Sequence, residues 1–438
     1  MCNKNQNPVI SLDDPRAKRG RFLYILEAAF EYFITLTITG AILAKVTQFL
    51  GFSDALTGIL SAFASLGCTF QLVALFLANK KPVKRWVTAG HIINQTAFAM
   101  VFAVPLLPIP AQLRNILFAG FLIVGYIIHS IIVSPKINWF MGLVKEEKKG
   151  VFTSIKESVS LVGGMIFSFV MGYLIDRYEE NGEIRNAYIL LAVTCFSLMI
   201  LHALTLIFTV ERDDDDEPLA IERPGFSLLK QLLSDKRVFA VISIDCLWAI
   251  TIGICTPFYG AYQVGPLGFS LVETSIFNVV HCLLRALLGP LLGRFADRHS
   301  FPELLRLSYL IAALSFAVMA FAVPSNGRII YLVYVVLYAI PAGGTSISGI
   351  NLIYSSVAPH RRMSAYALDR AVTGVIGFLA TLLAGLVVDR IQANGNLFLG
   401  IGAYAQQILS AFSAVMCILT FLFNLFILER LLAGKKAN

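Results

Sequence analysis

The sequence predicts an all-α membrane protein in which twelve transmembrane helices form two pseudo-symmetric six-helix bundles. Three observations lead to this fold class. Hydrophobic residues make up 57% of the 438 residues and charged residues only 14%, whereas a soluble protein of this length carries far more charge. Twelve apolar segments are long enough to cross a bilayer. The third observation is an internal repeat.

The repeat lies in the fifth and eleventh apolar segments. Residues 156–182 read KESVSLVGGMIFSFVMGYLIDRYEENG, and residues 369–395 read DRAVTGVIGFLATLLAGLVVDRIQANG. Both segments carry glycines at matching positions and end in the same polar Asp-Arg…Asn-Gly turn. A second match pairs Leu-Gly-Phe-Ser at 50–53 with the same four residues at 267–270. The chain therefore consists of two related halves, a pattern typical of transporter folds.

The predicted spans follow one another with mostly short loops, six spans in each half. A long polar segment, residues 211–237, separates the halves, so we predict an N-terminal bundle over 1–210, a cytoplasmic linker over 211–237 and a C-terminal bundle over 238–438. The linker contains an acidic run at 213–217 and an amphipathic stretch at 226–233, which we expect along the inner membrane surface. The spans are predicted at residues 22–50, 54–78, 87–106, 114–135, 151–175, 187–210, 238–262, 271–293, 304–324, 328–353, 366–388 and 398–428.

The charge pattern sets the expected topology. Lys and Arg concentrate at both termini and in alternate loops, so the positive-inside rule predicts a multi-pass protein of the cell (inner or plasma) membrane with both termini in the cytoplasm. The net charge of +8 therefore reflects topology, and we expect no nucleic-acid partner. The seven cysteines are scattered, which favours neither a disulfide framework nor a metal site. No nucleophile–base constellation, metal set or phosphate loop stands out, so we expect no enzyme activity and no cofactor.

The loop between spans eight and nine carries the most specific motif. It reads Gly-Pro-Leu-Leu-Gly-Arg-Phe-Ala-Asp-Arg-His over 289–299 and resembles the G-x-x-x-D-R loop of the major facilitator superfamily. The matching loop of the first half, residues 79–85, keeps basic residues but lacks the Asp and the glycines. Residues 134–139 and 148–152, placed in the loop after span four, resemble the same loop in bacterial members of that family.

The resemblance implies the major facilitator fold, in which two bundles rock about a site near the bilayer midplane. It also implies a cavity lined chiefly by spans one, four, seven and ten. Span four lacks the membrane-embedded arginine of many proton-coupled members, and span five lacks the Gly-Pro pair of antiporters. These departures favour symport or uniport over drug/proton antiport.

Ionisable residues inside apolar spans are costly to bury, so we treat each as a candidate for substrate binding or proton coupling. Glu27 and Glu31 lie one turn apart on one face of span one. A carboxylate in a partly dry cavity binds a proton more readily than one in water, which would let it load and release a proton. The alternative for Glu27 is a solvated side chain or a pair with Arg21.

The other candidates lie in spans four, seven, eight and ten. The fork of the Arg285 guanidinium suits a substrate carboxylate or phosphate, although an internal ion pair with Asp245 or Glu31 is the alternative. His129 in span four follows Tyr126 at helical spacing and is a candidate for the cavity wall, although a lone histidine is more often a hydrogen-bonded structural group. The complete set outside span one is His129, Asp245, His281, Arg285 and Asn351.

Charged residues at the cytoplasmic ends of the spans are predicted to form a latch by analogy with the family. One group pairs Asp297 and Arg298 with Lys156 and Glu157, and the other pairs Lys84 and Arg85 with Asp369. Opposite charges there would stabilise the state that is closed to the cytoplasm. The alternative is that these helix ends lie in solvent without pairing.

Together these observations predict a secondary active transporter that moves a small polar solute, a sugar or an organic acid, by proton-coupled symport and alternating access. We expect its partners to be a small-molecule substrate, protons and the lipid bilayer, and we expect a monomer. One alternative is an exporter of drugs or other amphiphiles by proton antiport, which the 33 phenylalanines would suit. An alternative of another class is a non-transporting membrane sensor or scaffold.

Overall fold

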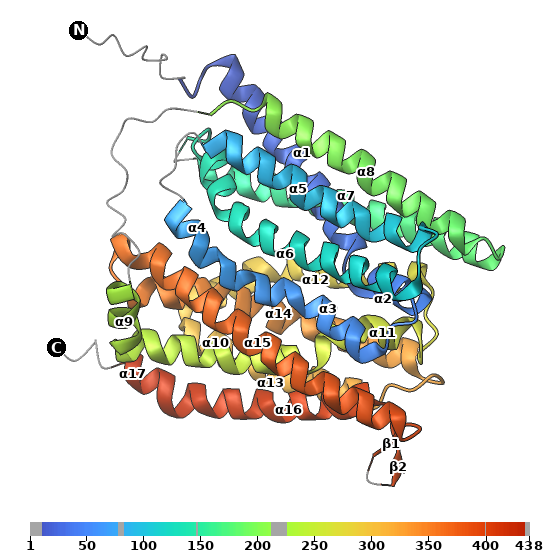
Figure 1. Ribbon diagram of the computed structural model, residues 1–438. Coiled ribbons are helices and arrows are strands. Elements are labelled where there is room, and N and C mark those ends of the chain that lie inside the picture. The colour runs from blue at the N-terminus through green and yellow to red at the C-terminus, as the bar shows by residue number, and fades with distance from the viewer. Residues whose placement is uncertain (1–10, 78–82, 146–147, 212–225, 399, 434–438) are drawn as a thin grey trace. The chain divides into compact units, whose positions relative to one another are not determined.

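The computed structural model describes residues 11–77, 83–145, 148–211, 226–398 and 400–433, and almost all of its elements are helices (Figure 1). The first half of the chain contains α1 (Pro15–Thr37), α2 (Gly40–Phe49), α3 (Asp54–Gly67), η1 (Cys68–Phe70), α4 (Gln71–Leu77), α5 (Val83–Ala103), η2 (Val104–Leu106), α6 (Ala111–Met141), α7 (Lys149–Glu180) and α8 (Ile184–Phe208). The second half contains α9 (Phe226–Ser234), α10 (Lys236–Cys255), η4 (Thr256–Phe258), α11 (Tyr259–Val264), α12 (Leu271–Arg298), α13 (Phe301–Met319), α14 (Gly327–Ser356), η5 (Pro359–Arg361), α15 (Arg362–Ala393), β1 (Leu397–Phe398), β2 (Ile401–Gly402), α16 (Ala405–Phe423), the π-helical turn η6 (Asn424–Leu428) and α17 (Glu429–Ala433).

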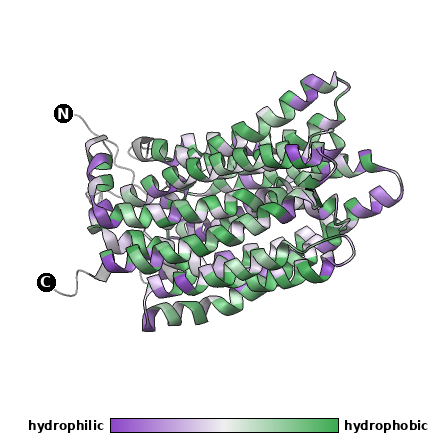
Figure 2. Ribbon diagram, turned by 90° about the horizontal axis from the view of Figure 1, so that it is seen from below, coloured by the Kyte–Doolittle hydropathy of each residue, from purple (hydrophilic) through white to green (hydrophobic). Residues whose placement is uncertain are grey.

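Eleven spans within the described residues are long and apolar enough to cross a membrane. The pair α1 and α2, bent by 44° at its break, makes a twelfth. Figure 2 shows that hydrophobic residues predominate along these helices, as the hydrocarbon core of a bilayer requires. The predicted all-α membrane fold with twelve spans is confirmed.

Several predicted span boundaries differ from the helix boundaries; α1, for example, begins at Pro15 and not at residue 22. The fourth span was expected to end at residue 135, but α6 continues to Met141 with Pro135 inside it. Proline is tolerated within transmembrane helices because neighbouring groups satisfy the backbone carbonyl that it leaves free. The last span was expected from residue 398, but the antiparallel β1–β2 hairpin comes first and α16 begins at Ala405.

The repeated Leu-Gly-Phe-Ser motif has the same local structure in both halves. Gly51 and Gly268 have φ angles of 77° and 63°, a left-handed conformation that favours glycine. The serine that follows is in each case the N-cap of a helix. The Ser53 hydroxyl accepts from the backbone N–H of Leu56 at 3.2 Å, and the Ser270 hydroxyl accepts from that of Glu273 at 3.1 Å. The motif therefore begins α3 and α12 in equivalent ways.

The chain forms two compact units that do not coincide with the sequence halves. Unit 1 comprises the described residues of Met1–Thr37, Val73–Ser168 and Arg185–Glu222. Unit 2 comprises those of Ile38–Leu72, Phe169–Ile184 and Arg223–Asn438. The division into bundles over 1–210 and 238–438 stays a prediction, and the acidic run at 213–217 lies outside the described residues.

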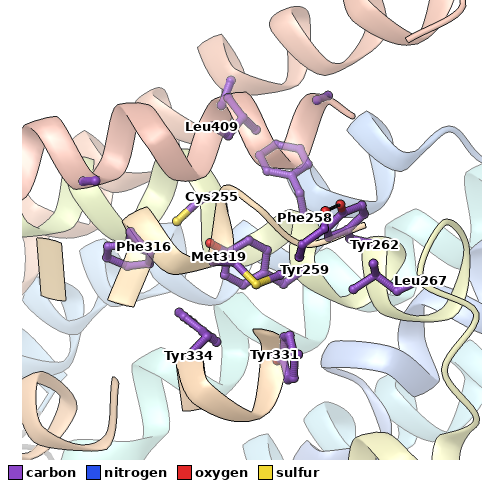
Figure 3. Close-up of a cluster of buried hydrophobic side chains, with 14 of the residues drawn as sticks. Cys255, Phe258, Tyr259, Tyr262, Leu267, Phe316, Met319, Tyr331, Tyr334 and Leu409 are labelled. Carbon is purple, nitrogen blue, oxygen red and sulfur yellow. Dashed lines mark hydrogen bonds between the residues drawn. The ribbon is translucent and has the colours of Figure 1, made fainter. Parts of the chain in front are cut away.

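The core of unit 2 is rich in aromatic residues, several of which Figure 3 labels. The Tyr259 hydroxyl lies 2.7 Å from the Ser410 hydroxyl, and the Tyr262 hydroxyl donates to the carbonyl of Ala322. Burial of such rings requires partners for their hydroxyls, which these bonds supply. A second cluster of unit 2 buries Leu228 and Leu232 of α9, whereas Leu233 of the same helix is exposed. The expected position of this helix along the inner membrane surface stays a prediction.

Candidate functional site

Helix α1 places two glutamates side by side in unit 1. Its residues Glu27 and Glu31 are one helical turn apart and therefore share a face. The Glu27 side chain is fully buried and that of Glu31 is 16% exposed. Arg21, the alternative partner considered for Glu27, instead donates to the backbone carbonyls of Leu12 and Leu143 at 3.0 and 2.8 Å. Glu27 is thus neither solvated nor paired with Arg21.

Lys136 of α6 joins these two carboxylates. Its Nζ lies 2.6 Å from Glu27 Oε1 and also donates to Glu31 Oε2. The Lys136 side chain is only 3% exposed. The prediction that this lysine lies in the loop after span four is wrong, because α6 continues through Pro135. A sequence signal existed, since Lys136 follows His129 by about two helical turns and so lies on the same face.

Three histidines surround the two glutamates and the lysine. Nε2 of His202, on α8, lies 2.9 Å from Glu27 Oε1. Nδ1 of His129, on α6, lies 3.3 Å from Glu31 Oε1. The ring of His91, on α5, meets that of His202 edge-on with centroids 5.0 Å apart. We call the following six residues the buried ionic cluster: Glu27, Glu31, His91, His129, Lys136 and His202.

The charges of this cluster do not balance when its histidines are neutral. Two carboxylates face one ammonium, and unpaired charge in a low-dielectric interior is costly. Among the described residues, Glu27 Oε2 and both ring nitrogens of His91 have no hydrogen-bond partner. One additional proton would neutralise the cluster and supply a missing donor. The arrangement is therefore suited to binding a proton.

His129 is the most exposed member of the buried ionic cluster. Its side chain is 32% exposed, which is twice the exposed fraction of Glu31 and contrasts with the fully buried Glu27. The contacts run from His129 to Glu31, then to Lys136 and Glu27. A proton entering at the imidazole thus meets Glu31 before the buried pair.

A metal ion is a second occupant that the donor atoms allow. One ligand atom each from Glu27, Glu31 and His91 lies within 4.8 Å of the others. The ammonium of Lys136, however, contacts both carboxylates and takes the place that a cation would need between them. We therefore assign no metal to these residues.

A second buried ionic group lies in unit 2, between α10 and α15. Arg370 donates to Asp369 Oδ2 from Nε at 3.0 Å and from Nη2 at 2.8 Å, and the same Nη2 lies 3.8 Å from Asp245 Oδ2. Both aspartates are buried, so Asp369 is not a helix end held in solvent. Asp245 was predicted in the substrate or proton-coupling site and Asp369 in the latch; the structure brings the two together beside Arg370.

The remaining site candidates do not gather around either group. His281 of α12 stacks on Tyr338 with centroids 6.0 Å apart, and Arg285 of the same helix is exposed. The exposed Asn351 donates to the carbonyl of Ile347 at 2.7 Å. The ion pairs of Asp245 and Glu31 are with Arg370, Lys136 and His129. An ion pair with Arg285 is not among them.

Two of the predicted latch residues, Lys156 and Lys84, have local partners within their own unit. The Lys156 ammonium lies 5.1 Å from the centre of the Tyr24 ring. Lys84 donates from Nζ to the carbonyl of Ile207 at 2.7 Å and from its backbone N–H to Glu211 at 2.9 Å. The other residues of the predicted latch are Glu157, Arg85, Asp297 and Arg298. Because each predicted pair takes one residue from each unit, the latch stays a prediction.

A polar junction in unit 2 connects segments from the two sequence halves. Asp176, from the repeated Asp-Arg…Asn-Gly turn at the end of α7, accepts from the backbone N–H groups of Leu271 and Val272 at 3.0 and 2.9 Å. These groups form the N-terminus of α12, where a negative charge is favourable. Lys45 of α2 lies 3.2 Å from Asp176 and also contacts Glu179. We call these residues and the first turn of α12 the Asp176 junction.

Comparisons with known proteins agree with this architecture. The family model described as Major Facilitator Superfamily matches residues 25–381. No curated protein sequence gives a match. The crystal structure of the nucleoside transporter NupG superposes with a TM-score of 0.71 at 15% identity, covering 94% of this chain and 98% of that one.

Two further solved structures have the same fold. An inward-facing, unoccupied bacterial homologue of the human lysosomal transporter Spinster has a TM-score of 0.71 at 14% identity, covering 96% of this chain and 98% of that one. A D-xylose–proton symporter has a TM-score of 0.66 at 15% identity, covering 91% of this chain and 97% of that one. At these identities the likeness concerns the fold alone.

Proposed function

We propose a coupling mechanism for this chain, which belongs to the major facilitator superfamily and is a multi-pass membrane transporter, not an enzyme. In this mechanism the protein takes up a small polar solute, a sugar or an organic acid, together with protons by alternating access. The buried ionic cluster is the observation that carries the proposal.

The first step concerns the proton. The cluster holds two carboxylates and one ammonium out of water, so it is one positive charge short when its histidines are neutral. A proton on Glu31 or on a neighbouring imidazole restores neutrality. Glu31 is the better acceptor, because it is partly exposed and lies next to His129, whereas Glu27 is enclosed by Lys136 and His202. We assign proton exchange to Glu31 and His129, and positioning to Glu27, Lys136 and His202.

The second step concerns the link between protonation and conformation. Protonation of Glu31 removes one of the two negative charges that hold the Lys136 ammonium. Because Glu31 and Glu27 lie on α1 and Lys136 on α6, the change alters how strongly these two helices attract each other. A transporter that favours different helix arrangements with and without the proton couples proton binding to its conformational equilibrium.

The third step concerns alternating access. By the positive-inside rule, the Asp176 junction lies at the membrane face opposite the cytoplasm. It binds α7 and α2 of the first sequence half to α12 of the second. We propose that it holds this face closed while the site is open to the cytoplasm. A D-xylose–proton symporter with the same fold lends support to a polar solute and to protons as partners.

We also propose the cell membrane as the location, with both termini in the cytoplasm, and a monomer as the working unit. The position of the termini rests on the distribution of Lys and Arg in the sequence.

A ligand screen by thermal stability tests the substrate class. Purified protein is heated with sugars, organic acids, amino acids and cationic amphiphiles at two pH values, since a ligand of the folded state raises the melting temperature by mass action. We expect a sugar or acid to give a pH-dependent shift that disappears in Glu31→Gln and persists in Glu180→Gln, a change at an exposed surface pair. Shifts with cationic amphiphiles alone would contradict the proposal and favour an exporter.

A further inference from the structure

We infer that Asp245 and Asp369 share one proton beside Arg370 and form a second proton-binding site, separate from the buried ionic cluster. Proton binding here follows from the local geometry of unit 2. Only its use in transport rests on the function proposed above.

The packing of α10 on α15 makes the two aspartates neighbours. A Cβ built on Gly253 would lie 2.6 Å from the carbonyl oxygen of Gly377, so the two helices touch through glycine. At the same place the Thr381 hydroxyl donates to the carbonyl of Gly253 at 2.8 Å. Asp245 and Asp369 each precede their glycine by about two turns. Both helices are odd-numbered spans that cross in the same direction, so equal steps from the contact keep the aspartates side by side.

Arg370 confirms that the carboxylates are adjacent, because one of its nitrogens approaches both. That nitrogen lies 2.8 Å from Asp369 Oδ2 and 3.8 Å from Asp245 Oδ2. The guanidinium also lies over the Tyr366 ring, 5.4 Å from its centre. One guanidinium therefore faces two buried carboxylates, and its shorter nitrogen–oxygen contacts are with Asp369.

Each carboxylate keeps one buried oxygen that lacks a donor. Among the described residues, neither Asp245 Oδ2 nor Asp369 Oδ1 has a hydrogen-bond partner. Two like charges in contact within a low-dielectric region cannot both remain ionised at low cost. One proton supplies the missing donor and leaves a single negative charge to balance Arg370.

Among the described residues, no cation besides Arg370 is found to interact with the two aspartates. Helix α14 faces Asp245 with Gly349, where an added Cβ would lie 3.9 Å from both carboxylate oxygens. At this point α14 therefore brings its backbone, and no charged side chain, close to Asp245. The other ionisable groups that interact with the three residues are uncharged near neutral pH. They are Tyr309 of α13, Tyr366 of α15, Cys246 of α10 and Cys68 of η1.

The chemical step is a proton transfer alone. An O–H bond forms on one aspartate, and a water or hydronium ion on the donating side gives up the proton. The second aspartate accepts the resulting O–H hydrogen bond and keeps its ionic contact with Arg370. Losing the proton leaves two adjacent charges on α10 and α15, which repel each other.

Infrared difference spectroscopy on the purified, reconstituted full chain measures this proton directly. We expect a protonated-carboxyl band that appears on lowering the pH and shifts when aspartate is labelled with ¹³C at its side-chain carboxyl. Glutamate carboxyls do not shift with this label, which separates the pair from Glu27 and Glu31. The band should vanish in both Asp245→Asn and Asp369→Asn, since the remaining carboxylate then pairs with Arg370.

Two further variants keep the test decisive if an asparagine variant does not fold. Arg370→Gln removes the cation. The protonated-carboxyl band should then persist to a higher pH than in the wild type, the opposite of its loss in the asparagine variants. Asp389→Asn, at an exposed aspartate of the same helix, should leave it unchanged. A labelled band that persists in both asparagine variants, or no labelled band in the wild type, would overturn the inference. Glu31→Gln should retain the band even though it removes proton-driven transport, so the two proposals fail independently.

Discussion

Replacing Lys136 with methionine tests the electrostatics of the buried ionic cluster. At 2.6 Å and an effective dielectric constant of about 20, the attraction between Lys136 and Glu27 is about 6 kcal/mol. Desolvation of both groups offsets much of that. Removal of one partner nevertheless leaves a buried carboxylate uncompensated, which costs about 3–5 kcal/mol. Methionine keeps most of the side-chain volume, so we attribute that loss of unfolding free energy to charge.

Equilibrium unfolding by SDS in mixed detergent micelles measures this loss. The matched control is Lys145→Met, because Lys145 pairs with Asp13 at 2.8 Å on the surface, where a pair contributes about 1 kcal/mol or less. Adding Glu27→Gln to Lys136→Met removes the stranded charge and should restore more than half of the lost stability. The reasoning is refuted if Lys136→Met costs no more than Lys145→Met, or if the double variant is less stable than the single one.

Three other variants test the proton path and the Asp176 junction. His129→Asn should slow proton-driven uptake while ligand binding, measured by thermal shift, stays intact; weakened binding would show that His129 contacts the solute. Asp176→Asn weakens charge-assisted hydrogen bonds that contribute about 1.5–3 kcal/mol. It should raise the outward-open population roughly tenfold to a hundredfold. The assay places a cysteine at the buried Ala55 and measures how much faster a membrane-impermeant reagent labels it. Gly172→Ala should act in the same direction, because its Cβ would lie 3.0 Å from the Leu271 backbone, at an overpacking cost of about 1–3 kcal/mol. As the control, Gly120→Ala, where the added Cβ would have nothing within 4 Å, should not change labelling.

Much of the fold followed from the sequence because hydropathy is a local property. A run of apolar residues must be helical in a bilayer, so the twelve spans could be found without knowing what they pack against. The repeat also predicted equivalent local structure, and the Ser53 and Ser270 caps confirm it. Hydropathy could not decide how far a helix continues into polar sequence, which is why the end of α6 was missed.

The site was only partly predictable, because burial depends on packing between distant segments. The spacing of Glu27 and Glu31 gave their shared face, but a lysine after a proline looked like a loop residue. Nothing in the local sequence around Asp369 indicated that α15 packs on α10 through Gly253 and Gly377. Asp176 was recognised as repeated, yet its equivalent Asp389 is exposed. Repetition alone therefore did not identify which copy binds a helix terminus.

The central claim is that Glu31 couples proton movement to solute movement. The most direct measurement compares two modes of transport in proteoliposomes, using the solute found in the ligand screen. One is accumulation driven by a pH gradient, and the other is solute exchange without a gradient. Glu31→Gln should lose accumulation and keep exchange, because the solute site and the conformational cycle remain while the exchangeable proton is gone. Accumulation that persists in Glu31→Gln at the wild-type level would contradict the account.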